Sequence, residues 1–326
     1  DEHSTTLGFN FKDESLNDGA TNTLSNEIIK MNRDSYAIFG EDEWAISDDL
    51  ILTLSTRYDK NEEFGGNLSP KAYAVYHLTD NLTFKGGVVT GYKAPSLRMS
   101  STDFASTSRG GVTLGNPELE PEKSLSFETG LAYDNSDIGL KGSLTVYKTY
   151  FKDKISTTSL ICQPNEECTV NGVTYAAHQY GYRLRENIDE VELKGIEITN
   201  DYDITDSLTY KHSYTYSNSE QKSGTNAGKP LNDLPKHMFN VSLDWDYDKN
   251  LNIWTQLNHR SKTIGDTSDA NQPRYSFVDL GAVYKLTKKI KLKAGIYNLT
   301  NREVTRDNYD VVLDGRRYSF GMDMKF

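Results

Sequence analysis

The sequence predicts an all-β protein, an antiparallel transmembrane β-barrel. Three observations predict this fold class: segments of about ten residues alternate apolar and polar side chains, short and long connections follow one another in turn, and no run of about eighteen apolar residues occurs. The third observation excludes a helical membrane protein. A barrel needs apolar side chains only at alternate strand positions, so its mean hydropathy, here −0.66, stays polar.

The last stretch of the chain shows the alternation most clearly. From Gly315 to Phe326, apolar side chains occupy every second position from Tyr318 onward, and polar or small residues lie between them. A period of two is typical of a strand with one apolar and one polar face. We expect the apolar face to meet lipid and the polar face, which includes Arg317, to line an aqueous lumen. A soluble sandwich is disfavoured, because alternating charged side chains are hard to bury.

The same alternation runs through the whole chain and predicts about fourteen strands. An even number is expected when neighbouring strands pair up and down around a barrel. The predicted strands are Ser4–Phe11, Asp34–Ile46, Leu50–Tyr58, Ser69–Leu78, Leu82–Tyr92, Ser124–Tyr133, Ile138–Phe151, Glu186–Tyr202, Ser207–Tyr216, Lys236–Tyr247, Leu251–Ser261, Arg274–Leu286, Ile290–Leu299 and Arg316–Phe326.

The connections between these strands are predicted to alternate short and long without exception. The short ones are rich in Asp, Asn and Ser, as tight turns are. Bacterial outer-membrane barrels have short periplasmic turns and long outer loops, whereas soluble propellers lack this asymmetry. We therefore expect one domain, 1–326, with its carboxyl terminus in the periplasm. The long connections are Lys12–Arg33, Asp59–Leu68, Lys93–Lys123, Lys152–Arg185, Ser217–Pro235, Lys262–Pro273 and Thr300–Gly315.

Two cysteines, Cys162 and Cys168, lie close together in one long connection. With no other cysteine in the chain, a disulfide formed in an oxidising compartment is favoured over two free thiols. A metal site is disfavoured, because two thiols without nearby partner ligands do not complete one. The chain starts at Asp1 without a signal peptide, so we expect a mature chain or a fragment.

Four motifs identify a family resemblance. They are Gly91–Leu97 (GYKAPSL), Asn116–Glu122 (NPELEPE), Leu193–Glu197 (LKGIE) and Asn298–Asn301 (NLTN). Together they resemble the signatures of TonB-dependent outer-membrane receptors.

Within that family, Lys229–Pro235 (KPLNDLP) and Asp314–Tyr318 (DGRRY) are most similar to the catecholate siderophore type, represented by the colicin I receptor and the ferric enterobactin receptors.

The resemblance implies an importer of ferric catecholate siderophores in the bacterial outer membrane, energised through TonB–ExbB–ExbD. Family members close about twenty-two strands around an amino-terminal plug. This sequence shows neither a plug nor a TonB box, so it resembles the carboxyl-terminal part of such a barrel. No cofactor is expected, and iron enters only as part of the ferric siderophore.

A ferric catecholate is aromatic and anionic, so a receptor needs cations and aromatic rings above its lumen. The same cations could instead meet lipopolysaccharide phosphates or loop carboxylates. The candidate ligand-binding residues are Arg98, Phe104, Arg109, Arg183, Arg185 and Arg317.

Other function classes are disfavoured or left open. A net charge of −11 argues against nucleic acid, and no nucleophile, phosphate-loop or metal-ligand motif indicates an enzyme. A passive porin is an alternative, although porins lack the signature motifs. A haem receptor is a weaker one, because no histidine lies between Ser96 and Asn116. The outer loops could also serve colicins or phage as a docking site.

Overall fold

The computed structural model of the protein describes residues 2–24, 27–108, 110–224, 226–264, 272–309 and 311–325. The described residues form a sheet of sixteen strands, of which fourteen make a continuous antiparallel path that follows their order along the chain, and two short strands lie off that path. Among the described residues, no helix has the length and apolar composition that crossing a membrane requires. The predicted all-β, up-and-down architecture is therefore confirmed.

All fourteen predicted strands are present, and most continue further toward the long connections than the alternation indicates. They are β1 (His3–Asp18), β2 (Ile29–Ala45), β3 (Leu50–Asn61), β4 (Gly65–Thr79), β5 (Leu82–Lys93), β8 (Glu122–Asn135), β9 (Leu140–Thr157), β12 (Tyr182–Thr205), β13 (Leu208–Gln221), β14 (His237–Asp246), β15 (Leu251–Arg260), β16 (Tyr275–Lys285), β17 (Ile290–Tyr297) and β18 (Arg317–Met324).

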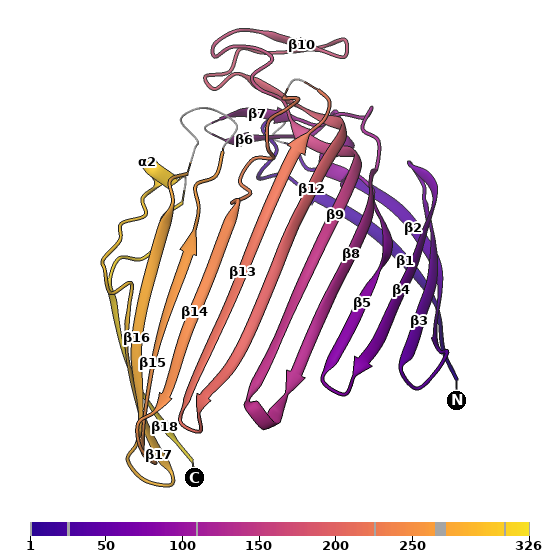
Figure 1. Ribbon diagram of the computed structural model, residues 1–326. Helices are drawn as coiled ribbons and strands as arrows, with labels where there is room; N and C mark the ends of the chain where they lie inside the picture. The colour runs from indigo at the N-terminus through magenta and orange to yellow at the C-terminus, as the bar shows by residue number, and fades with distance from the viewer. Residues whose placement is uncertain are drawn as a thin grey trace.

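The sheet curves like part of a barrel wall (Figure 1). Its two edges are β1 and β18, and in the described part of the chain each of them pairs on one side only. Both termini lie at the end of the sheet that carries the tight turns, and the longer connections lie at the opposite end (Figure 1). We call these the turn end and the loop end.

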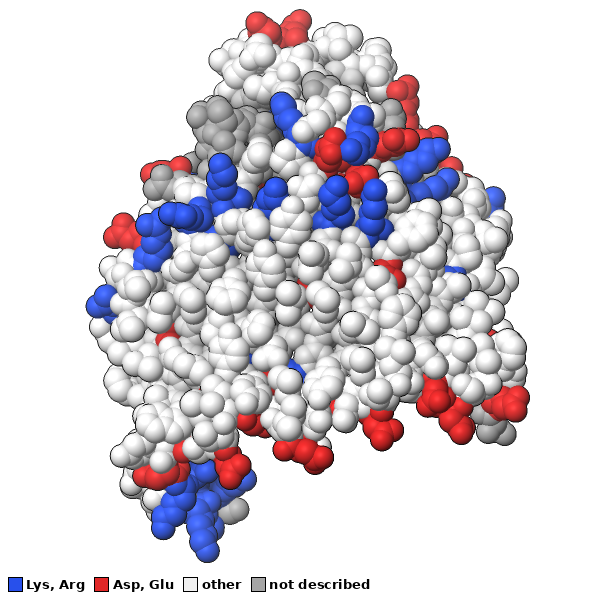
Figure 2. Space-filling view, in the orientation of Figure 1, with Lys and Arg blue, Asp and Glu red and all other residues white. Residues whose placement is uncertain are grey.

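The two faces of the sheet differ as the alternation predicts. In β8, Leu125, Phe127 and Leu131 are exposed, whereas Gly130 between them is buried. Figure 2 shows a broad band of the outward face with few charged side chains, bordered by Lys and Arg toward the loop end and by Asp and Glu toward the turn end, with a further group of Lys and Arg beyond these acidic residues at the lower left. A lipid-facing band bordered by polar belts is what a membrane barrel requires.

At the loop end, some strands extend beyond the apolar band. In β1 the exposed apolar side chains end at Phe11, and the strand then continues to Asp18 through residues that are all polar except the half-buried Leu16. A membrane crossing needs about ten strand residues. The last part of β1 therefore lies outside the lipid.

The inward face is polar and interconnected. The Tyr73 hydroxyl in β4 donates to the Glu128 carboxylate in β8 at 2.6 Å, reaching across β5. Gly87 of β5 makes this possible, because a Cβ there would lie 2.5 Å from the Tyr73 ring. Glycine at this position therefore lets a long side chain bridge three strands.

Two features of the connections differ from the prediction. The connection predicted as Asp59–Leu68 is a turn of three residues between β3 and β4, so the strict alternation of short and long is wrong at this point. Asn61 closes the turn, because its side-chain oxygen accepts hydrogen bonds from the Glu63 and Phe64 amides. The remaining elements, which the alternation does not predict, are α1 (Leu97–Ser100), β6 (Ala105–Ser108), β7 (Gly111–Leu114), η1 (Ser136–Ile138), β10 (Cys168–Val170), β11 (Val173–Tyr175) and α2 (Arg306–Tyr309).

Candidate ligand-binding site

Two long connections fold together at the loop end of the sheet. In the connection between β5 and β8, α1 is followed by the β6–β7 hairpin, and β7 pairs in parallel with the first residues of β12. This pairing, with Thr113 opposite Arg183, fastens one connection to the strand that follows the other. We call the described residues of 19–24, 94–121 and 158–184 the cap.

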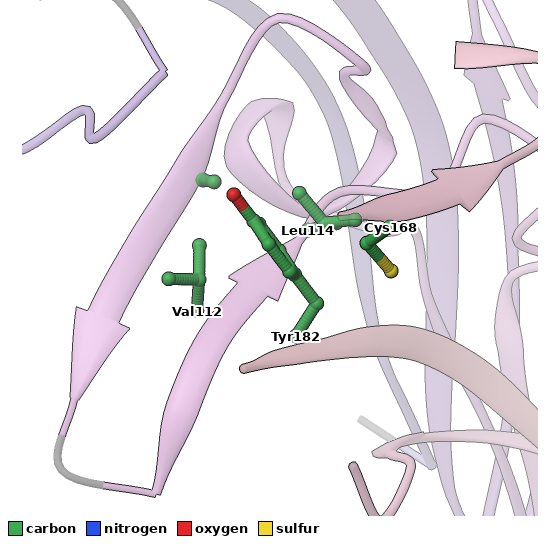
Figure 3. Close-up of a cluster of buried hydrophobic side chains, with 5 residues drawn as sticks. Val112, Leu114, Cys168 and Tyr182 are labelled. Atoms are coloured by element: carbon green, nitrogen blue, oxygen red, sulfur yellow. The ribbon is translucent and has the colours of Figure 1, made fainter. Parts of the chain in front are cut away.

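A small apolar core lies inside the cap. Its buried side chains are Ala105, Val112, Leu114, Cys168 and Tyr182 (Figure 3). The Tyr182 hydroxyl donates to the Ala176 carbonyl at 2.6 Å, and burial raises the pKa of Tyr182. The disulfide between Cys162 and Cys168, which the sequence predicts, is present beside this core. The cap is thus a compact unit outside the lipid-facing wall.

The connection between β1 and β2 joins the cap through Asn22. The Asn22 side chain donates to the Asp103 carbonyl at 2.9 Å and accepts from the Ala105 amide at 3.1 Å. The Thr23 amide also donates to the Ala105 carbonyl at 3.0 Å. Because the Asn22 amide both donates and accepts, this one side chain joins the β1–β2 connection to the β6–β7 hairpin.

Arg33 anchors the cap to the first strands. Its guanidinium, 4% exposed, donates to the Glu63 carboxylate at 2.9 Å, the Glu14 carboxylate at 3.5 Å and the Pro95 carbonyl at 2.7 Å. A buried cation needs such partners to offset its lost hydration. Arg33 was not among the residues predicted from the sequence, although its register opposite Glu14 puts the pair on one face.

Arg98 and Phe104, two predicted ligand residues, lie together in the cap. The Arg98 guanidinium lies 5.1 Å from the centre of the Phe104 ring and 2.9 Å from the Asp18 carboxylate. Phe104 itself is 4% exposed, so its ring lies buried beneath the Arg98 guanidinium. Hydrogen bonds from Thr21, with a smaller effect of Arg98, lower the pKa of Asp18 to about 2. Arg109 lies outside the described residues.

Arg183 and Arg185 share one face at the start of β12. Arg183 is buried beside the β6–β7 hairpin, where a Cβ added to Gly110 would lie 3.2 Å from its Nη2 atom. Arg185 donates to the Thr157 hydroxyl at 2.9 Å, and burial lowers the pKa of its guanidinium. Ligand contact by these cap residues stays a prediction.

Arg317 lies apart from the cap, in an inward-facing pocket of about 440 Å³ at the loop end of β14–β18. Its guanidinium lies 4.8 Å from the centre of the Tyr297 ring, its partner in register. The inward position predicted for Arg317 is thereby confirmed. Arg260 lies in the same pocket, 5.9 Å from the centre of the Tyr275 ring, and donates to the Gln272 side chain at 2.9 Å.

The base of this pocket is organised by Asn298 in the NLTN motif. Asn298 has a φ of 52°, a left-handed conformation that asparagine tolerates. Its buried side chain donates to the carbonyls of Arg302 at 2.8 Å and Asp314 at 3.2 Å, and its amide donates to the Asp279 carboxylate at 2.8 Å. Asn298 therefore fixes the connection that leads into Arg317.

The structure thus divides the predicted ligand residues between two places. Arg98, Phe104 and Arg183 belong to the cap, Arg185 follows it directly in β12, and Arg317 belongs to the pocket, which adds two arginine-on-ring pairs to the inward wall. Within the described residues, no cluster of three or more His, Cys, Asp or Glu side chains is placed to hold a metal ion. The pocket offers cations and aromatic faces but no metal-ligand set.

The lipid-facing band, the polar inner wall and the capped loop end together define an outer-membrane β-barrel of the receptor class. Residues 2–299 match the family model "TonB dependent receptor-like, beta-barrel". The chain belongs to this family, as its four motifs predict, and it resides in the bacterial outer membrane.

Three comparisons place the chain among its relatives. It is 41% identical to the iron-regulated outer membrane virulence protein of Vibrio cholerae over 100% of this chain and 49% of that protein. It is 27% identical to the ferric enterobactin receptor of Pseudomonas aeruginosa over 94% of this chain and 44% of that protein. A solved structure of a mutant of the Pseudomonas aeruginosa ferric enterobactin receptor with enterobactin covers 99% of this chain and 52% of that one, at 24% identity and a TM-score of 0.81. That likeness shows the fold, and the chain spans about half the length of these relatives.

Proposed function

We propose that this chain forms the ligand-binding wall of an outer-membrane receptor that imports ferric catecholate siderophores. The observation that carries the proposal is the inward pocket, where Arg260 and Arg317 each lie over a tyrosine ring. Guanidiniums held over aromatic faces suit a ligand that is both anionic and aromatic. The names of relatives support the same ligand class, since one of them is a ferric enterobactin receptor.

The pocket cations are held by partners that a ligand can displace. Arg317 pairs with Asp314 at 3.2 Å, but both side chains are largely exposed, and such a pair contributes about 0–1 kcal/mol. Arg260 is bonded to the neutral Gln272. When a catecholate complex enters from the loop end, Arg260 and Arg317 can therefore leave these weak partners and donate charge-assisted hydrogen bonds to the complex.

Import against a gradient needs energy, and the family is named for its dependence on TonB. We infer that the receptor containing this chain is energised by TonB–ExbB–ExbD, through a plug like that of its family. Iron is carried as part of the ferric siderophore and is not a resident cofactor. Docking of colicin or phage on the cap is a further expectation.

The test is ligand binding by the receptor that contains this chain, measured by fluorescence quenching with purified ferric catecholates. Arg317→Ala should weaken binding by about tenfold, the loss of one charge-assisted contact. Arg316→Ala is the matched control, because Arg316 precedes Arg317 and its amide, not its side chain, is bonded to Asn301. Equal affinity of Arg317→Ala and wild type, with uptake of labelled iron unchanged, would refute the proposal.

A further inference from the structure

The three tryptophans of the chain do not share one face of the sheet. Trp44 and Trp245 are exposed on the outward face, where aromatic rings are typical of a membrane interface. Trp254 of β15 instead faces inward, because its register partner is Gly281 of β16 and the ladders from β15 to β18 carry that row to the face of Arg317. Lipid therefore does not explain an indole ring at this position.

The Trp254 ring lies against the sheet and leaves one side open. A Cβ added to Gly281 would collide with the indole, so glycine lets the ring rest on the backbone of β16. The Tyr297 ring lies beside Gly295 in the same way, since a Cβ there would be 3.1 Å from its Cε2 atom. The centres of the two rings are 6.0 Å apart, and Trp254 borders an inward cavity of about 440 Å³. We call Trp254 and Tyr297 the ring platform.

The ring platform adjoins the arginine pocket on the side of the turn end. Tyr297 belongs to both, because it lines the pocket and contacts Trp254. Trp254 is six residues from Arg260 along β15, a distance of about 20 Å in a strand. The inward positions between them are Asn258 and Gln256, which carry no charge. This strand thus offers an uncharged path from the pocket to the platform.

An anionic aromatic ligand meets different surroundings at the two ends of this path. In the pocket, Arg260 and Arg317 add positive charge to the ring contacts. At the platform, Asp244 lies opposite Trp254 and its carboxylate accepts from the Asn252 side chain at 2.6 Å. Rings beside a carboxylate hold an anion more weakly than rings beside guanidiniums. Passage through a pore requires sites that a ligand can leave as well as enter.

We propose that Trp254 is a second contact for the ferric catecholate, made after the ligand leaves the arginine pocket toward the turn end. This inference rests on the proposed function and adds a step to it. A catechol ring of the complex would stack on the open side of the indole, while its charged oxygens stay in the aqueous interior. Tyr297 lies between the two contacts and shortens the transfer from one to the other.

The experiment measures uptake of radiolabelled ferric enterobactin by cells that make the receptor containing this chain, per amount of folded receptor. Trp254→Leu should lower the maximal uptake rate about tenfold, as loss of one ring contact does, and leave the equilibrium affinity in a quenching titration unchanged. Trp254→Phe should retain most of the rate, because it keeps an aromatic face. Trp245→Leu is the matched control, since Trp245 pairs with Ile253 at the same level but faces outward.

A cross-linking experiment detects the contact itself. A phenylalanine with a benzophenone side chain replaces Trp254 in one receptor and Trp245 in another, and the cells are illuminated while they import enterobactin labelled in its organic part. The ligand should become attached at the first position and not at the second. A ring that only covers Gly281 would give no attached ligand at either position. Import without attachment at the first position, or equal uptake rates of Trp254→Leu and Trp254→Phe, would overturn the proposal.

The second contact and the arginine pocket fail separately. Normal uptake by Trp254→Leu, together with weakened binding by Arg317→Ala, would remove the second contact and leave the pocket in place. Slow uptake by Trp254→Leu, together with unchanged binding by Arg317→Ala, would remove the pocket and leave the second contact in place.

Discussion

The cap and the inward pocket both place arginines at the loop end, yet they hold them in opposite ways. At the base of the cap, Arg33 of β2 is buried among two carboxylates and a carbonyl, and Arg98 in the cap is paired with a carboxylate that is itself buried. In the pocket, Arg260 and Arg317 lie over tyrosine rings and keep weak or exposed partners. In this acidic chain, the partner of an arginine therefore decides whether the arginine supports the fold or is available to a ligand.

Removing Arg33, the buried cation that anchors the cap to the first strands, is expected to have the greatest effect. Arg33→Ala leaves Glu14 and Glu63 without their shared partner, and such a loss costs about 3–5 kcal/mol. Thermal unfolding of the folded receptor in detergent measures it. Arg57→Ala is the control, since the Arg57–Asp59 pair is far more solvent-exposed than Arg33 and contributes about 1 kcal/mol. Similar losses for the two variants would remove the distinction between the two kinds of arginine.

The disulfide gives the next largest effect, and it should be local. Replacing Cys162 and Cys168 by serine is expected to cost about 2 kcal/mol of cap stability. Hydrogen exchange should quicken in residues 105–108 and 168–175, which flank the apolar core, and stay unchanged in β13 and β14. Faster exchange throughout the sheet would mean that the cap and the wall are one cooperative unit.

Arg98→Ala tests whether a cap arginine contributes less to ligand binding than an arginine of the pocket. From the sequence, replacing Arg98 together with Arg109 by alanine is expected to weaken ferric-catecholate affinity. Because Arg98 is engaged with Asp18, we expect a loss of about threefold, smaller than that of Arg317→Ala. The same quenching titration measures both variants. An Arg98→Ala effect as large as that of Arg317→Ala would show that the cap cation is equally available to ligand.

The smallest effect concerns pH. The pKa of Asp18 is lowered to about 2, so its folded form favours the carboxylate. Its contribution is therefore complete above the ordinary Asp pKa near 3.8 and is lost as the pH falls toward about 2. Proteolysis of residues 19–24 should be unchanged from pH 7 to 5 and should rise below pH 4. Asp18→Asn should abolish that acid-dependent rise, and its persistence in the variant would assign it to another group.

The strands were predictable wherever lipid enforces alternation. Leu125, Phe127 and Leu131 reveal β8 because one face must meet hydrocarbon. The extra length of β1 up to Asp18 was not predictable, since strands beyond the lipid have no apolar face to maintain. The position of Arg317 followed from parity alone, because a strand fixes the direction of each side chain.

The cap was not predictable, because long-range contacts build it. Asn22 bonds to Ala105 across 83 positions, and nothing in either local sequence indicates that pairing. The same holds for Arg33 and the Pro95 carbonyl. The hydrogen bond from Arg98 to Asp18 is also a long-range contact. The sequence therefore identifies the cations but does not show which of them are already paired with a carboxylate.

The length of β12 determines how far the cap stands from the membrane. The strand runs unbroken for 24 residues, about twice what a membrane crossing requires. Its extra length holds the disulfide-bearing part of the cap above the lipid head groups. A macromolecule too large to enter the lumen would therefore reach that part of the cap before it could reach the side chains that face lipid.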